Sequence, residues 1–505
     1  MGRKKLMKTA GSLVAALCLG AAVASAQAAS RRMSDAQIVQ DLRAHLDELA
    51  AQDRFSGTVL LAKNGQLLFQ HAYGFADHAF DARNTVETKF NLASMGKIFT
   101  AVAIMQLEQE GKLSVDDRLL KLVPDYPNKE VAAKITIGEL LTHTSGLGDF
   151  FGPAFQNSNQ AQYQTIESYL PLFASQPLLF EPGSRYSYSN AGYIVLGLVI
   201  ERVSGESYND YVREHIFAPA GMNNTGFWSA QDDVPNLALS YTSMFGGFRQ
   251  GPAGAHRERS VNVSVARGAS AGGAYSTVGD LLRFAQALAA HKLLDAAHTD
   301  ELMTGKVLQV ANPNAQGAAA RQPDNGSKYG YGMHEEFING VRIVGHSGGA
   351  PGISTDLAIY PAEGYVSIEL SNYDGGADLV NPRLRWELTG HALPQAAHVE
   401  AAALEGLAGT YKAPPSANSG MGMVIVMHGR FMPPPIKVKA EGDALVVDLG
   451  PGGGVHKYLP LSTTEFFDED APGTRLKFKV DGNGRTTNLS IAGSALNIAD
   501  APRLP

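Results

Sequence analysis

Ser94 and Lys97 form a Ser-x-x-Lys pair just ahead of an apolar run, Ile98 to Leu107, whose spacing predicts a buried helix. If Ser94 lies at the helix start, Lys97 is one turn further on and both side chains project from the same face. A serine hydroxyl needs an adjacent base to act as a nucleophile, and a lysine can serve where its surroundings lower its pKa. The pair therefore indicates acyl-transfer chemistry, but in isolation it is more often an N-cap serine and a solvated lysine.

Two later stretches could supply the other groups that such chemistry needs. Tyr188-x-Asn190 offers a phenol that could shuttle a proton to the leaving group, and an amide that could hold a substrate carbonyl or the lysine. The Gly-His-Ser-Gly-Gly sequence that contains His346, Gly348 and Gly349 directly follows an apolar strand. Its glycines would let a ligand approach the backbone and would place a second oxyanion N–H at Gly349. Each stretch alone is more often core packing or a tight turn.

Other serines and a histidine offer competing interpretations. Ser270 and Ser347 both lie in Gly-x-Ser-x-Gly, the nucleophile elbow of α/β-hydrolases. That elbow requires a strand, a turn and an immediate helix, and neither serine is followed at once by a helix. His143 is expected to be a structural residue that hydrogen-bonds the backbone under the site. Because no HExxH, calcium loop or dinucleotide fingerprint is present, no metal and no cofactor are predicted.

The first thirty residues differ from the rest of the 505-residue chain. Cations within the first eight residues precede an apolar run from Leu13 to Val23 and then small residues suited to cleavage. We interpret residues 1–28 as a removed secretory signal, too short for a stable membrane anchor, and expect a secreted or periplasmic protein. The single cysteine, Cys18, lies inside it, which excludes disulfides and thiolate metal sites from the mature chain. A net charge of −7 argues against a nucleic-acid partner.

Residues 29–395 are predicted to form one α+β domain. A hairpin signal, Asn64-Gly65, joins two strands near its beginning, and further strands and a helix return near its end. This order predicts an antiparallel sheet, flanked by helices and completed by both ends of the domain, with a mostly helical insertion between them. The expected strands are 56–62, 66–73, 341–344, 355–360 and 365–371.

The last segment, 405–505, is predicted to be a separate all-β domain. Short alternating runs, such as 423–427, 444–449, 476–480 and 488–491, are separated by Gly and Asp turns. Residues 392–404 lack a clear period and fit a linker or short helix. We therefore expect a small barrel or sandwich after the linker.

The joint order of Ser94-x-x-Lys97, Tyr188-x-Asn190 and His346-x-Gly348 resembles the serine β-lactamase and penicillin-binding protein superfamily. The similarity is greatest to the branch with class C β-lactamases, D-alanyl-D-alanine carboxypeptidases, D-aminopeptidases and family VIII esterases. It covers roughly residues 55–389 and implies a β-lactamase/transpeptidase-like fold. The start of the last domain is similar to the lipocalin-like domain attached to some of these hydrolases. Further likenesses are Leu140–Leu147, Pro182-Gly183 and Ala271–Gly273.

The resemblance assigns roles to individual residues. It implies that Ser94 is the acylated nucleophile, Lys97 its proton acceptor and Tyr188 the acid/base partner. Asn190 would position the substrate, together with the strand that holds His346, Gly348 and Gly349. His346 stands where lactamases of this branch have a lysine, and a mostly neutral histidine would bind a β-lactam carboxylate poorly.

From these observations we expect an exported serine hydrolase that acts through an acyl-enzyme on amides or esters. D-amino-acid peptides or small esters are the expected substrates. The first alternative is a penicillin-binding or peptidoglycan-sensing protein with little turnover, and a weaker one is a class C-like β-lactamase. The expected partner is a small molecule or peptide, and the oligomeric state stays open.

Overall fold

The computed structural model describes residues 32–229, 232–243, 258–260, 269–309, 326–391, 393–412, 435–450, 454–493 and 497–504. The predicted signal, 1–28, and the expected strand at 423–427 lie outside these ranges. Within them, no helix is both long and apolar enough to cross a bilayer.

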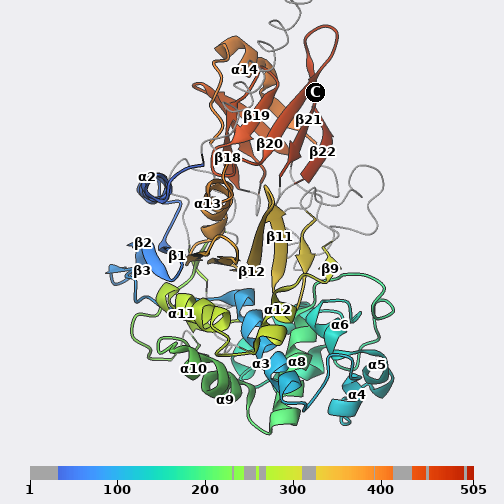
Figure 1. The fold of residues 1–505 in the computed structure, drawn as a ribbon. Coiled ribbons are helices and arrows are strands. Elements are labelled where there is room, and N and C mark those ends of the chain that lie inside the picture. The colour runs from blue at the N-terminus through green and yellow to red at the C-terminus, as the bar shows by residue number, and fades with distance from the viewer. Residues whose placement is uncertain are drawn as a thin grey trace, which may run out of the picture.

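One eight-stranded antiparallel sheet is built from both ends of the first domain (Figure 1). β1 (Gly57–Lys63) and β2 (Gln66–Tyr73) form the predicted hairpin, and both residues of its Asn64-Gly65 turn have positive φ. β1 pairs with β14 (Tyr365–Ser371) from the far end of the domain, which confirms the predicted sheet. The order is β2-β1-β14-β13-β12-β11-β10-β9, with β13 (Ile353–Tyr360), β12 (Val341–Ala350), β11 (His334–Ile338), β10 (Lys328–Tyr329) and β9 (Val307–Leu308).

Strand β12 is longer than the sequence predicted. It continues through the glycine-rich stretch that resembles a tight turn and ends at Ala350. The glycines allow this because the neighbouring strand comes very close: a Cβ at Gly345 would lie 1.8 Å from the carbonyl oxygen of Leu357. The strands β9, β10 and β11 were not predicted. Two of them, β9 and β10, have only two residues each, which is too short for a sequence pattern.

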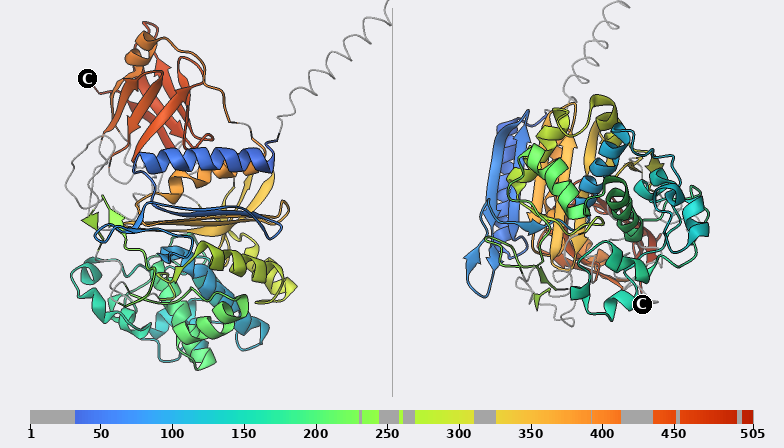
Figure 2. Two further views of the ribbon diagram at one scale, coloured as in Figure 1. Left: turned by 90° about the vertical axis from the view of Figure 1, so that its left-hand side faces the viewer. Right: turned by 90° about the horizontal axis from the view of Figure 1, so that it is seen from below.

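Helices cover both faces of the sheet (Figure 2). α2 (Asp35–Ala51) and α13 (Asn381–Leu388) pack on one face around Leu46 and Leu384. The other face is covered by α3 (Lys97–Gln109), α8 (Asn190–Ser204) and α11 (Val278–Ala289). The prediction of a helix-flanked sheet is therefore confirmed.

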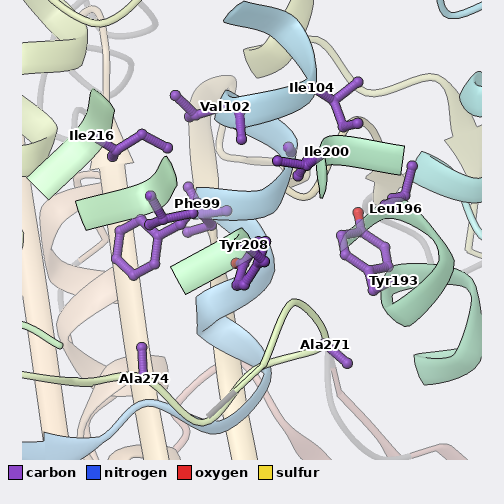
Figure 3. Close-up of a cluster of buried hydrophobic side chains, with 14 of the residues drawn as sticks. Phe99, Val102, Ile104, Tyr193, Leu196, Ile200, Tyr208, Ile216, Ala271 and Ala274 are labelled. Carbon is purple, nitrogen blue, oxygen red and sulfur yellow. The ribbon is translucent and has the colours of Figure 1, made fainter. Parts of the chain in front are cut away.

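α3 is the central helix of the second layer. Its residues from Lys97 to Met105 are all buried, because the run is apolar around almost its whole circumference. Phe99 and Ile104 pack among side chains of α8 and neighbouring segments (Figure 3). The insertion around it is mostly helical, as predicted. Its other helices are α4 (Leu119–Leu122), α5 (Lys129–Lys134), α6 (Ile137–Leu141), α7 (Pro153–Gln156), α9 (Tyr208–Val212), α10 (Ala218–Ala220) and α12 (Ala296–Met303).

The C-terminal strands form a second, barrel-like antiparallel sheet in sequential order, as predicted. The first strand also hydrogen-bonds the last residues, since Leu504 N–H donates to Thr410 O at 2.7 Å, which nearly closes the barrel. Tyr411, Phe466 and Leu489 are completely buried inside it. Helix α14 (Ala401–Leu407) precedes β15 (Gly409–Tyr411), β16 (Ile436–Glu441), β17 (Ala444–Asp448), β18 (Val455–Pro460), β19 (Glu465–Asp468), β20 (Arg475–Val480), β21 (Thr486–Ala492) and β22 (Asn497–Pro502).

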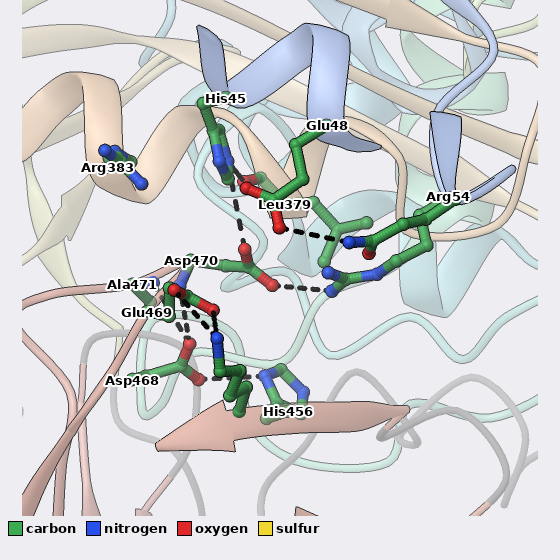
Figure 4. A network of polar contacts seen from close by, with 12 residues as sticks. His45, Glu48, Arg54, Leu379, Arg383, His456, Asp468, Glu469, Asp470 and Ala471 are labelled. Atoms are coloured by element: carbon green, nitrogen blue, oxygen red, sulfur yellow. Dashed lines mark hydrogen bonds and ion pairs between the residues drawn. The ribbon is translucent and has the colours of Figure 1, made fainter. Parts of the chain in front are cut away.

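A polar contact joins the barrel to the face of the first domain that α2 covers (Figure 4). Arg54 Nη2 donates to Asp470 Oδ2 at 2.6 Å, and His45 Nε2 lies 3.9 Å from the other oxygen of the same carboxylate. The barrel thus contacts the sheet layer on the side opposite α3.

Candidate active site

Ser94 lies in a 3₁₀ turn, Ala93–Gly96, immediately before α3. The sequence placed Ser94 at the helix start, and the structure inserts this tighter turn between them. Ala93 adopts a left-handed conformation with φ 44°, which is uncommon outside glycine and asparagine. The Asn91 side chain holds it, because Asn91 Oδ1 accepts the Ala93 N–H at 2.8 Å. The strained turn presents Ser94 half-buried, within reach of solvent.

Lys97 begins α3 and is completely buried. Its Nζ atom donates to Ser94 Oγ at 3.1 Å, to Asn190 Oδ1 at 2.8 Å and to the Ala271 carbonyl at 2.6 Å. Burial lowers the pKa of Lys97 to about 7, and the Asp149 carboxylate opposes that shift. At neutral pH a large fraction of the amine is therefore unprotonated, and its lone pair can face the serine hydroxyl.

Tyr188 lies beside the same amine, with its ring centre 4.9 Å from Lys97 Nζ. Desolvation raises the pKa of Tyr188 well above its usual value, and an interaction with Ser94 opposes the rise. The phenol is therefore neutral at pH 7 and can donate a proton. The segment around Tyr188 is irregular, and His143 supports it, since the Ser189 N–H donates to His143 Nδ1 at 3.1 Å.

Asn190 is the first residue of α8 and is also largely buried. Its side-chain oxygen accepts from Lys97, and its Nδ2 donates to Asp149 Oδ2 at 2.9 Å. Of the two roles left open by the sequence, holding the lysine is the one that these contacts display.

His346 is buried, and protein groups engage both of its ring nitrogens. Nδ1–H donates to the Ser347 carbonyl, which leaves Nε2 to accept from the Tyr329 hydroxyl at 3.0 Å. Burial, with a smaller effect from His334, lowers the pKa of His346 well below its usual value. The buried ring is therefore neutral and offers a substrate carboxylate no positive charge.

Gly348 and Gly349 differ in what surrounds them. A Cβ at Gly348 would lie 2.0 Å from Leu92 O, so only glycine lets β12 approach the Ser94 turn this closely. A Cβ at Gly349 would meet no described atom within 4 Å beyond its chain neighbours, which leaves open space in front of the strand.

The competing nucleophiles do not occupy an elbow. Ser270 is completely buried in a turn, and Ser347 lies inside strand β12 with no helix after it. Within the described ranges, no group of three or more His, Cys, Asp or Glu side chains could hold a metal ion.

Two contributors to the site were missed by the sequence reasoning. Asp149 contacts Asn190, and the Ala271 carbonyl accepts from Lys97. Ala271 lies in Ala271–Gly273, which the sequence indicated only as a further similarity to the superfamily. Asp149 closely follows the His143 segment, which is the one sequence signal that could have drawn attention to it.

Comparisons with known proteins place the chain in a family. A family model described as Beta-lactamase matches residues 40–390. Penicillin-binding protein 4* of Bacillus subtilis (strain 168) is 31% identical over 345 residues, which cover 66% of this chain and 72% of the relative. The solved penicillin binding protein from Bacillus halodurans has a TM-score of 0.59 at 31% identity, covering 68% of this chain and 98% of that chain.

A D-amino acid amidase from Ochrobactrum anthropi SV3, solved with D-phenylalanine, has a TM-score of 0.57 at 23% identity. The match covers 70% of this chain and 98% of the amidase, and at this identity it shows the fold alone. The chain belongs to the beta-lactamase family, a family of serine hydrolases that also contains penicillin-binding proteins.

Proposed function

We propose that this protein is a serine hydrolase in which Ser94 is acylated by an amide or ester substrate. The observation that supports this most is the contact of a fully buried Lys97 amine with Ser94 Oγ at 3.1 Å. A lysine whose pKa is lowered to about 7 is suited to act as a general base at neutral pH.

In the proposed acylation step, the Ser94 proton moves to the Lys97 lone pair while Oγ forms a bond to the substrate carbonyl carbon. The carbonyl electrons move onto oxygen, where the N–H groups of Ser94 and Gly349 stabilise the charge. The oxygen electrons then return, and the bond to the leaving group breaks. Tyr188 gives its proton to that group and recovers one from Lys97. Water releases the acyl group by the reverse sequence.

We propose D-amino-acid peptides or amides, or small esters, as substrates. A neutral, buried His346 gives no fixed charge for a β-lactam carboxylate, which disfavours efficient lactamase activity. The penicillin-binding relatives and the amidase of the same fold are consistent with D-amino-acid derivatives. A protein that is acylated but turns over slowly is the alternative for the same site.

The test is a substrate panel with intact-mass detection of the acyl-enzyme. D-phenylalanine amide, a D-alanyl-D-alanine peptide, a p-nitrophenyl ester, a chromogenic cephalosporin and a fluorescent penicillin are each incubated with the purified protein. We expect turnover of an amide, peptide or ester and a mass adduct that Ser94→Ala abolishes. Labelling by penicillin without turnover of any compound would favour the slow binder. Loss of activity in Ser270→Ala alone would assign the nucleophile to Ser270 instead of Ser94.

We also propose that residues 1–28 direct export, that 29–395 form the hydrolase domain and that 405–505 form a separate barrel domain. The mass and cellular location of the mature protein test the first point. Limited proteolysis tests the boundary: cleavage near residue 400 should release a folded barrel.

A further inference from the structure

Asp149 holds three hydrogen bonds at the start of α8. Its Oδ2 atom accepts from the Asn190 backbone N–H at 3.0 Å and from Asn190 Nδ2 at 2.9 Å. Its Oδ1 atom accepts from the Phe151 N–H at 3.1 Å. A carboxylate is also favoured at a helix N-terminus, where unpaired N–H groups concentrate positive charge. The side chain is thus fixed against the residue that contacts the predicted general base.

This contact decides which way the Asn190 amide faces. A carboxylate only accepts hydrogen bonds, so the Asn190 NH₂ group must point to Asp149. The amide oxygen is then left facing Lys97 Nζ, from which it accepts at 2.8 Å. Without Asp149 the amide could turn over and present its NH₂ group to the amine, where two donors would oppose each other.

Asp149 also differs in charge from the other groups around Lys97. Tyr188 and Tyr193 place their rings 4.9 and 5.4 Å from Nζ, and desolvation raises the pKa of both phenols, so both are neutral at pH 7. His143 and His346 also interact with Lys97 and are neutral, because burial lowers the pKa of each imidazole. Among the residues that the structure describes, the hydrogen-bond partners of Nζ are the uncharged oxygens of Ser94, Asn190 and Ala271.

We propose that Asp149 is a positioning residue of the acylation site, which turns the Asn190 amide oxygen toward Lys97 and places a negative charge behind the amine. The proposal rests on the proposed function, since it concerns the base that would activate Ser94. Asp149 does not touch the reacting atoms and acts through Asn190 and through its charge.

The test is the pH dependence of acylation by a p-nitrophenyl ester in Asp149→Asn and Asp149→Glu. Loss of the carboxylate should stabilise the uncharged amine, so the acidic limb of kcat/KM should move to lower pH in Asp149→Asn. The maximal rate should fall about 10- to 100-fold, because the Asn190 amide is no longer held. Asp149→Glu, which keeps the charge, should return the limb toward its original position.

Asp280→Asn is the matched control. Asp280 is also a carboxylate near a helix N-terminus, and it accepts from the Asn224 N–H at 2.7 Å and the Thr225 hydroxyl at 2.8 Å, away from the site. This variant should lose thermal stability without moving the limb. If Asp149→Asn behaves in the same way, the positioning role is overturned while the proposed function stands. Absence of any acylation in the unmodified protein would overturn both.

Discussion

Two fully buried ionisable side chains lie on opposite faces of the same sheet. Lys97 is on the face covered by α3 and α8, and Glu369 of β14 is on the face covered by α2 and α13, because side chains alternate along a strand. Burial favours the neutral form of both: it lowers the pKa of Lys97 to about 7 and raises that of Glu369 well above its usual value.

Their partners differ. Lys97 makes three hydrogen bonds, one of them to a half-buried hydroxyl. Neither carboxyl oxygen of Glu369 has a hydrogen-bond partner among the residues that the structure describes. Burial is thus the main cause of both pKa shifts, but catalysis also needs a partner atom that a substrate can reach. Replacing residues on each face tests this difference.

The largest expected effect is that of Lys97→Met. Methionine fills the apolar space but cannot accept the Ser94 proton, so acylation should slow by about 10³-fold or more. In the unmodified protein, the rate should rise with pH through about 7 as the amine loses its proton. Stopped-flow acylation with a p-nitrophenyl ester measures both. A variant that acylates normally would show that Lys97 is only a buried structural group.

The next effect concerns the charged groups around Glu369. Arg385 Nη2 donates to the buried Asp356 at 2.7 Å, and the same guanidinium contacts Glu336. Arg385→Met would leave Asp356 buried without its cation, which should cost about 3–5 kcal/mol of unfolding free energy. Urea unfolding at pH 7 measures the loss.

The control for this substitution is Arg202→Met. Arg202 also contacts two carboxylates, Asp125 at 3.0 Å and Glu167 at 2.8 Å, but both are more than half exposed. Solvent screens such pairs, so the loss should stay below about 1 kcal/mol. Equal losses of unfolding free energy in the two variants would mean that burial does not determine how much each arginine stabilises the fold.

The sequence predicted the contacts around Lys97 better than the packing on the opposite face of the sheet. Ser94, Lys97, Tyr188 and Asn190 were placed together because their motifs and order are specific. In the structure Ser94, Tyr188 and Asn190 all contact the Lys97 amine. The sheet followed from the hairpin signal and the apolar runs. His346 was expected to face the substrate, but Tyr329, on a two-residue strand without a sequence signal, engages its ring.

Sequence motifs and spacing did not predict the positions of four other residues: Asp149, Ala271, Asp356 and Glu369. Asp149 and Ala271 act through contacts between segments far apart in the chain, which spacing does not reveal. Asp356 and Glu369 alternate with apolar residues along their strands, a pattern that favours a solvent-facing side. The segments that cover that face, including α2 and α13, bury them.

The smallest expected effect is that of Glu369→Gln, and its sign depends on pH. Since burial raises the pKa of Glu369 in the folded state, the folded protein holds this proton where the unfolded chain has lost it. The unmodified protein therefore loses stability as pH rises above the carboxyl's unfolded value. Glutamine does not ionise, so the fall in unfolding free energy between pH 5 and pH 8 should shrink by about 1 kcal/mol or more, one pKa unit being worth about 1.4 kcal/mol. Urea unfolding of both proteins at the two pH values measures the change. An unaltered slope would mean that Glu369 ionises in the fold as readily as in the unfolded chain, and the contrast with Lys97 would then rest on their partners alone.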